Sequence, residues 1–168
     1  GVRDITVNVH HFADQIIEFA HAHDAQCAED EKWNLRFSDE TALLLETGGA
    51  IRKVYADRPE MQDEPLLVLN ADILSNIDLE AFVASYEGEF AKLVVSERKT
   101  QRYFVFEDAK MLGWTNIAIG GIKPETLTAE KVAQGKLLAF SGMHILSPEA
   151  MKMLQDYPER FSITDFYI

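Results

Sequence analysis

The chain has 168 residues, of which 47% are hydrophobic and 26% are charged, as is typical of a globular domain with a buried core. Its net charge of −12 argues against nucleic-acid polymers and anionic membranes as partners, because both call for basic patches, although a divalent cation can bridge acidic groups to a phosphate ligand. Cys27 is the only cysteine, which excludes an internal disulfide, and no apolar stretch approaches a membrane span. We expect one cytoplasmic domain over residues 1–168.

Strands and helices alternate in the first half of the sequence. The hydrophobic pattern predicts, in chain order, a strand over Ile5–Val9, an amphipathic helix over Phe12–Ala22, an apolar run over Leu43–Leu45, a helix over Ala50–Tyr55, a buried strand over Leu66–Leu69 and a helix over Asp78–Tyr86. Asp78 is the expected N-cap of the last helix. Leu79, Phe82 and Val83 should face inward from it. Such alternation is typical of an α/β fold with a mainly parallel sheet.

The second half is richer in strands. It contains, in chain order, a strand over Lys92–Ser96, a hairpin of Tyr103–Phe106 and Met111–Trp114, a long strand over Leu137–Leu146 interrupted at Ser141-Gly142, and a helix that begins at Ser147-Pro148-Glu149. The last residues, Phe161–Ile168, resemble the first turn of a further helix.

Polar and glycine residues follow three of the apolar segments. His10-His11 follows the first strand, Glu46-Thr47-Gly48-Gly49 follows Leu43–Leu45, and Asn70-Ala71-Asp72 follows Leu66–Leu69. Ligands of open parallel sheets bind beyond the carboxyl ends of the strands. We therefore expect these three segments to line one crevice.

Each of these features also has a purely structural explanation. Gly-Gly pairs form tight turns, Asp72 suits a turn or a cap, and Ser141-Gly142 suits a bulge. The histidines have no carboxylate or cysteine cluster at metal-ligand spacing, so solvated surface histidines are favoured. The basic segment Glu97–Arg102 is interpreted as a solvated loop. The sequence contains no GxGxxG fingerprint, no phosphate loop and no Gly-x-Ser-x-Gly nucleophile motif.

Taken together and in order, six segments resemble the sugar-1-phosphate nucleotidyltransferases. They are VNVHHFADQI, LLETGGAI, LVLNADIL, VSERKTQRYFVF with LGWTN, AFSGMHILSPE and FSITDFY. The most similar branch includes N-acetylmuramate-1-phosphate uridylyltransferase and mannose-1-phosphate guanylyltransferase-like proteins. The resemblance extends from Val7 to Tyr167.

This resemblance implies a fold and a reaction. The fold would be a Rossmann-like three-layer α/β/α sandwich with a mixed, mainly parallel sheet. The enzyme would bind a nucleoside triphosphate and a sugar-1-phosphate, with Mg²⁺ as cofactor, and release an NDP-sugar and pyrophosphate. Such a transfer depends on bringing two anions into line beside a cation that offsets their charge.

The same resemblance assigns roles to particular residues. Asp72 matches the position that holds Mg²⁺ and is the catalytic candidate, with Ala-Asp here in place of the usual Gly-Asp. The nucleotide-binding candidates are Glu46, Thr47, Gly48, Gly49 and Asn70. The sugar-binding candidates are Gly142, Thr115 and Asn116. Since glycine weakens a strand, we expect the sugar to approach the backbone at Gly142, and Gly142→Val should spare thermal stability.

The sequence also departs from the family pattern. The glycine-rich loop Gly-x-Gly-Thr-Arg with its later Pro-Lys is absent and would precede Gly1, and the second metal aspartate would follow Ile168. Many relatives have Glu-Lys-Pro near the sugar site, where this chain has Trp114-Thr115-Asn116. We therefore expect that the domain is incomplete at both ends and that the 168 residues alone are inactive and less stable than a longer chain.

Two alternatives stay open at this point. One is a cytidylyltransferase for a non-sugar phosphate such as phosphocholine, which an aromatic cage around Trp114 would favour. The other is a non-catalytic nucleotide-binding or regulatory domain with the same fold. The sequence does not identify the nucleotide base, the sugar or the oligomeric state, for which a homo-oligomer is one option.

Overall fold

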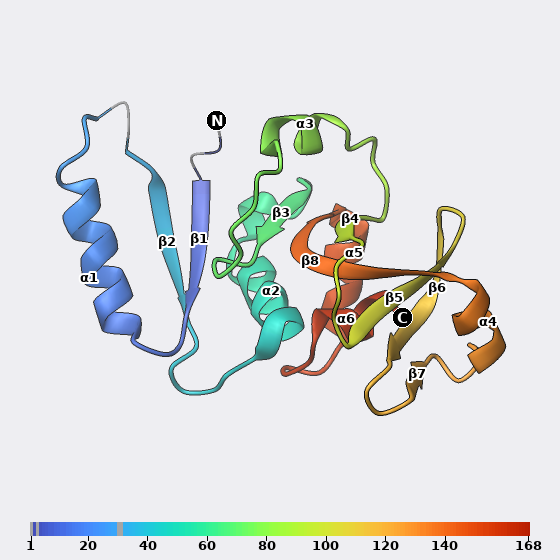
Figure 1. Cartoon of the computed structure of the whole chain (residues 1–168). Coiled ribbons are helices and arrows are strands. Elements are labelled where there is room, and N and C mark those ends of the chain that lie inside the picture. Colours follow the sequence, from blue (N-terminus) through green and yellow to red (C-terminus); the bar gives the residue numbers. More distant parts are fainter. Residues whose placement is uncertain (1, 3, 30–31) are drawn as a thin grey trace. The chain divides into compact units, whose positions relative to one another are not determined.

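A computed structural model of the chain describes residues 2, 4–29 and 32–168 (Figure 1). The chain divides into two compact units. The first unit contains Gly1–Gln62 and Met151–Ile163, and the second contains Asp63–Ala150 and Thr164–Ile168. The chain therefore passes from the first unit to the second, back to the first, and ends in the second.

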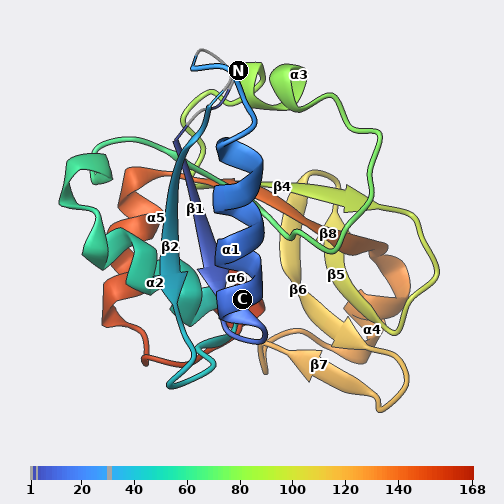
Figure 2. The same ribbon diagram turned by 90° about the vertical axis from the view of Figure 1, so that its left-hand side faces the viewer.

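The first unit is built around two parallel strands. Strand β1 (Asp4–Val9) pairs with β2 (Asn34–Asp39), from Asp4 opposite Asn34 to Val9 opposite Asp39. The connection between them contains helix α1 (Ala13–Asp24), which lies along the strand pair in Figure 2. The remaining elements of the unit are α2 (Glu46–Asp57) and the 3-10 turns η1 (Pro59–Met61) and η2 (Leu154–Asp156).

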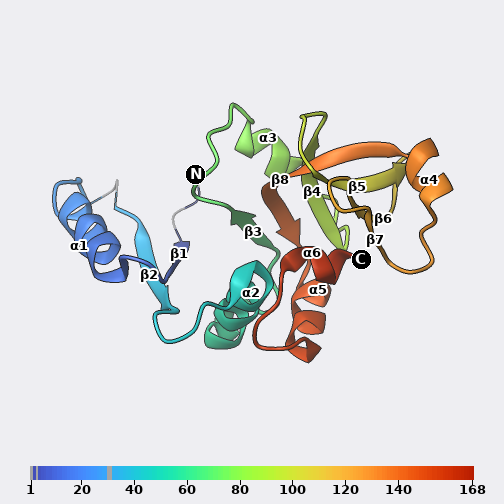
Figure 3. The ribbon, with the colours of Figure 1, turned by 60° about the horizontal axis from the view of Figure 1, so that its bottom comes forward.

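The second unit contains a six-stranded sheet. Its strands are β3 (Leu66–Leu69), β4 (Ala91–Ser96), β5 (Arg102–Glu107), β6 (Lys110–Asn116), β7 (Gly121–Lys123) and β8 (Lys136–Leu146). The order is β3-β8-β5-β6-β7, and β4 also pairs with β8. Its helices are α3 (Leu79–Ala84) and α4 (Ala129–Gln134), and Figure 3 shows α4 at the β5–β6–β7 end of the sheet. Helix α5 (Pro148–Met153) and helix α6 (Ile163–Tyr167) cross between the units.

The prediction of a mainly parallel sheet is wrong. Among the described residues, β1 and β2 form the parallel pair, whereas every pair in the six-stranded sheet is antiparallel. The reason is strand β8. Both β3 and β4 pair with it in the antiparallel sense, so the alternation of strands and helices produced parallel neighbours only in the β1–β2 pair among the described residues.

Several predicted local signals are confirmed. The Asp78 side chain accepts a hydrogen bond from the Ala81 amide at 2.9 Å and caps α3. Ser147 Oγ accepts from the Ala150 amide at 3.0 Å at the start of α5. Strands β5 and β6 form the predicted hairpin. These signals depend on neighbouring residues, which explains their success.

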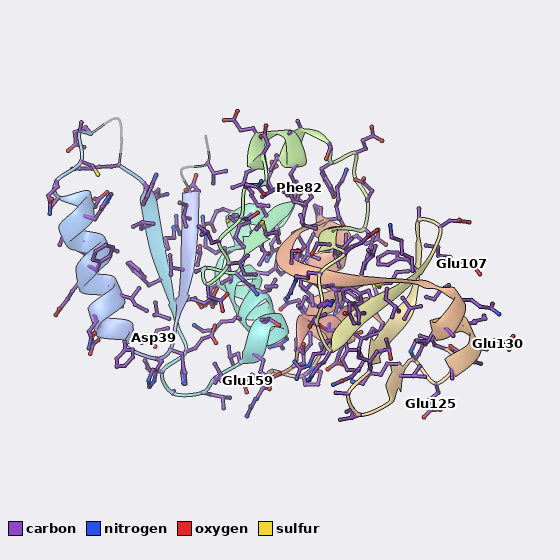
Figure 4. All side chains as sticks on the ribbon, in the orientation of Figure 1. Asp39, Phe82, Glu107, Glu125, Glu130 and Glu159 are labelled. Atoms are coloured by element: carbon purple, nitrogen blue, oxygen red, sulfur yellow. The ribbon has the colours of Figure 1, made fainter. Side chains whose placement is uncertain are left out.

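Burial differs from prediction on two helices. Phe12 at the start of α1 and Phe19 within it are 62% and 74% exposed, although the apolar side of an amphipathic helix is usually buried. In α3, Leu79 and Val83 are exposed as well, and Phe82 (labelled in Figure 4) is half-buried.

Within the described part of the chain, no helix is long and apolar enough to span a bilayer.

Candidate functional site

The tip of β3 is bound to a bulge in β8. Opposite β4, the register moves from Leu93 with His144 to Val95 with Phe140, so β8 contains extra residues at Ser141–Met143. Gly142 lies in this bulge with φ of 68°, and its carbonyl accepts a hydrogen bond from the Asn70 amide at 2.9 Å. The structure thus brings together a predicted nucleotide-binding residue and a predicted sugar-binding residue.

Gly142 is required by its intramolecular surroundings. A Cβ at this position would lie 2.6 Å from Asn70 Nδ2 and 2.6 Å from Ile73 Cδ1. The positive φ also disfavours a side chain. The expectation that Gly142→Val spares stability is therefore wrong, because Asn70 and Ile73 already fill the space that we reserved for a sugar.

Asp72 lies in the turn that follows β3 and is exposed. Within the described residues it makes no hydrogen bond and no ion pair, so its carboxylate is available to a ligand. The turn itself does not use this side chain, which weakens the turn-former explanation. Its neighbour Asn70 fixes the position of the turn through the Gly142 contact.

A Mg²⁺ ion at Asp72 remains a prediction, and it would take its other ligands from water and substrate phosphates. No cluster of three or more His, Cys, Asp or Glu side chains at metal-binding distance occurs in the described ranges. Mg²⁺ in phosphoryl-transfer sites is held by one or two carboxylates together with waters and substrate phosphates. A single free carboxylate at a strand end has this chemistry.

Glu46-Thr47-Gly48-Gly49 does not follow a strand, which corrects the prediction. Leu43–Leu45 is not a strand, and the four residues form the first turn of α2, where Glu46 has φ of 61°. The Phe161 carbonyl accepts from the Gly48 amide at 2.9 Å and from the Gly49 amide at 3.3 Å. These two amides are satisfied inside the first unit.

Both glycines are needed for packing within the first unit. A Cβ on Gly48 would lie 2.4 Å from the Phe161 ring, and one on Gly49 would meet the Glu159 carbonyl oxygen (Glu159 is labelled in Figure 4). Glu46 forms an ion pair with Arg160 at 3.1 Å, and Thr47 Oγ1 accepts from the Ile163 amide at 3.0 Å. The backbone that approaches Gly48 and Gly49 closely is thus that of Glu159–Phe161. A nucleotide contact at these glycines remains a prediction.

The structure also shows a buried carboxylate that the sequence reading missed. Glu40 is 5% exposed, and its Oε1 accepts from Asn8 Nδ2 at 2.8 Å while its Oε2 accepts from the Leu45 amide at 3.3 Å. Glu40 therefore ties β1 to the residue before Glu46. His10 Nδ1 donates to the Glu40 carbonyl at 2.6 Å, so this histidine is used structurally. An acidic residue directly after a strand was the only signal in the sequence.

Thr115 and Asn116 end β6 and are 3% and 8% exposed. Thr115 Oγ1 donates to the Gly121 carbonyl at 3.0 Å, and Asn116 Oδ1 accepts from the Ala118 amide at 3.1 Å. Both side chains hold the connection to β7. Strand β5 lies between their strand and β8, so no hydrogen bond joins them to Gly142.

One face of the Trp114 ring has a resident cation. Lys123 Nζ lies 5.9 Å from the ring centroid and forms an ion pair with Asp165 at 2.8 Å. An aromatic cage for a quaternary ammonium needs free ring faces. The surroundings of Trp114 therefore do not favour a choline-type acceptor.

Two shifted acid–base equilibria lie near these elements. The backbone amide of Thr41 lowers the pKa of the Asp39 carboxyl at the end of β2. In the second unit, burial lowers the pKa of His144, on the strand that contains Gly142, from 6.5 to about 4. His144 is therefore neutral at pH 7.

A hollow of about 310 Å³ lies between the β5–β6 hairpin and α4. Its lining includes Phe106, Glu107 (labelled in Figure 4), Lys131 and Lys136. None of its lining residues belongs to the predicted site at the β3 turn and the β8 bulge, where Asp72 is exposed and Gly142 is buried.

These elements define a mixed α/β fold, and solved structures with a similar fold exist. A structure of HddC from Yersinia pseudotuberculosis aligns with 98% of this chain and 64% of the HddC chain, at 20% identity and a TM-score of 0.62. HddC complexed with GMP-PN aligns over the same shares, at 22% identity and a TM-score of 0.63. This chain thus spans 64% of HddC, and at such identities the likeness establishes the fold alone.

A structure of UDP-glucose pyrophosphorylase complexed with UDP-glucose aligns with 98% of this chain and 67% of the pyrophosphorylase at 11% identity, but its TM-score of 0.49 is too low to support an argument. No family model and no curated protein sequence matches the chain.

Proposed function

We propose that this chain is part of a nucleotidyltransferase that transfers a nucleoside monophosphate from a nucleoside triphosphate to a sugar-1-phosphate. The observation that carries the proposal is the exposed Asp72 carboxylate, which has no hydrogen bond or ion pair among the described residues and lies two residues after Asn70, whose amide binds the Gly142 carbonyl. The fold likeness to HddC, which has been solved with GMP-PN, supports it. So does the order of the six sequence segments.

The reaction can be written in terms of bonds. A phosphate oxygen of the acceptor attacks the α-phosphorus of the triphosphate. The bond from that phosphorus to the oxygen bridging it to the β-phosphate breaks, and pyrophosphate leaves. Asp72 would hold Mg²⁺, which when bound neutralises charge on the reacting phosphates. The Glu46–Gly49 turn is proposed to contact the nucleotide.

The test is pyrophosphate release by the full-length natural protein, measured with Mg²⁺, each common nucleoside triphosphate and a panel of sugar-1-phosphates. Asp72→Asn should lower the rate by about 100-fold or more, because it removes the charge that positions the cation. The melting temperature should not change, since Asp72 is exposed and makes no hydrogen bond or ion pair with the described residues.

Asp108→Asn is the matched control. Asp108 lies in the β5–β6 turn with φ of 53°, a conformation that asparagine tolerates, so the same chemical change should leave the rate unaltered. Activity of Asp72→Asn within a few-fold of wild type would contradict the assignment. Nucleotide binding without pyrophosphate release by the wild type would instead support the non-catalytic alternative.

A further inference from the structure

We propose that Arg98 binds the phosphate group of the acceptor substrate. This inference rests on the proposed nucleotidyl transfer and adds a second residue to the reaction, on the opposite side of the β8 bulge from Asn70-Ala71-Asp72. The segment that contains Arg98 reads as a solvated loop on sequence grounds, and its contact with β8 is visible only in the structure.

The loop between β4 and β5 has an unbalanced positive charge. Glu97–Arg102 contains three cationic side chains and one carboxylate, in a chain whose net charge is −12. The carboxylate of Glu97 forms an ion pair with Lys136 at 2.6 Å, outside the loop. That hydrogen bond lowers the pKa of Glu97, which stays ionised and paired at neutral pH. The three cations, Arg98, Lys99 and Arg102, are thus not neutralised within the loop.

Arg98 is anchored but not saturated. Its Nη2 donates to the Phe140 carbonyl at 3.1 Å, two residues before Gly142. A guanidinium has five N–H donors in a planar fork. Among the described residues this is the only hydrogen bond of Arg98, and the side chain is exposed. One contact to β8 therefore orients the guanidinium while leaving most of its donors for a ligand.

Three segments of the second unit meet at the bulge. From β3, the Asn70 amide binds Gly142, and from the β4–β5 loop, Arg98 binds Phe140. Ser141 lies between Phe140 and Gly142 in the sequence, and its hydroxyl oxygen lies 3.4 Å from that of Ser96 at the end of β4. The β8 bulge is thus flanked by Asn70-Ala71-Asp72, which carries the Asp72 carboxylate, and by the β4–β5 loop, which carries the Arg98 guanidinium.

The chemistry of the reaction assigns the two sides to different phosphates. Asp72 suits the nucleotide phosphates, because a bridging metal ion can offset its negative charge. An acceptor phosphate monoester is a separate anion that must approach the α-phosphorus closely. Arginine presents paired donors that match phosphate oxygens. Arg98 therefore provides the cation that the acceptor needs on its own side of the bulge.

The experiment measures KM for both substrates in the full-length natural protein. Arg98→Ala should raise KM for the sugar-1-phosphate by about 10-fold to 100-fold, because a charge-assisted hydrogen-bonded pair is lost, and should change KM for the nucleoside triphosphate by less than about 2-fold. Arg98→Lys should recover part of the loss, since it keeps the charge but not the fork. Lys110→Ala, at the hairpin tip of the same unit, is the control for net charge.

A second readout separates this proposal from the proposed function. The Arg98 Nε–H signal in NMR spectra should shift on addition of glucose 1-phosphate or inorganic phosphate, and should not shift with glucose. If no triphosphate supports pyrophosphate release, the proposed function fails while this titration still tests the phosphate site. An equal rise of both KM values, or an Arg98 signal that ignores phosphate, would overturn the assignment.

Discussion

Lowering the pH from 7 to 4 should destabilise the second unit through a single buried side chain, His144. The ring is 1% exposed, and neither of its nitrogens has a hydrogen-bond partner among the described residues. It stacks on Phe140 at 5.3 Å and meets the edge of Tyr167 at 5.8 Å. Its neighbours on the adjacent strands, Val68 and Leu93, are apolar. Within the part of the chain that the structure describes, no hydrogen-bond partner compensates a charge on this imidazole.

The sign and size of the change in unfolding free energy follow from the pKa of His144. Burial lowers it from 6.5 to about 4, so the unfolded chain binds a proton below pH 6.5 whereas the folded chain does so only below about 4. Stability is therefore complete above pH 6.5 and is lost as the pH falls toward 4. At about 1.4 kcal/mol for each unit, the loss is about 3 kcal/mol. The facing Tyr167 hydroxyl stays neutral here, because burial raises its pKa.

The assay is urea unfolding of the full-length natural protein and of His144→Phe at pH values between 7.5 and 4. Phenylalanine keeps the ring that stacks on Phe140 and removes the titrating group. The difference in unfolding free energy between wild type and variant should be constant above pH 7 and should move by about 3 kcal/mol in favour of the variant by pH 4. Carboxylates that titrate in both proteins cancel in this difference.

His21→Gln, at an exposed position of α1, is the control substitution. The reasoning is refuted if the wild type and His144→Phe lose stability in parallel from pH 7 to 4. Parallel loss would mean that the folded chain protonates His144 as easily as the unfolded chain, and hence that water or a polar partner reaches the ring.

Two further changes test packing at the predicted site. Gly142→Ala should cost about 2–4 kcal/mol in urea unfolding, from the left-handed backbone and from crowding by the Asn70 side chain. Gly88→Ala is the control, because φ is 96° there and no described atom lies within 4 Å of the added Cβ, so only the cost of the left-handed backbone should appear. Equal losses of unfolding free energy in the two variants would show that crowding by Asn70 does not contribute. Glu40→Ala should cost about 1–3 kcal/mol, because the buried Leu45 N–H and the exposed Asn8 amide lose their acceptor. Under the proposed function it should also raise KM for the triphosphate, and Glu40→Gln should lose less; an unchanged KM would limit Glu40 to a structural role.

Local elements were predictable from the sequence because their causes are local. The Asp78 cap, the Ser147-Pro148 helix start and the β5–β6 hairpin each depend on residues a few positions apart. The direction of β3 and β4 was not predictable in this way. It depends on β8, whose partners in β3 lie far away in the sequence, and periodicity carries no information about strand orientation.

The contact between Asn70 and Gly142 agrees with their predicted closeness, but the sequence did not show how each residue is used. Asn70 and Gly142 do meet, and Asp72 is free. Gly48 and Gly49 resembled a ligand-facing turn because small residues permit close approach, but sequence alone cannot tell a ligand from another segment of the same chain. The segment that approaches them, Glu159–Phe161, is more than a hundred positions away.

The pairing of Leu66 with Leu146 also sets an order in time. A ribosome adds roughly 5–20 residues per second, so β3 emerges on the order of ten seconds before β8 is complete. During that interval neither β3 nor β4 can pair with β8, so the backbone N–H and C=O groups that form those ladders are unpaired. We expect the soluble yield of this protein to depend on how quickly translation proceeds between Ala91 and Leu146, and on chaperones that bind the unpaired strands.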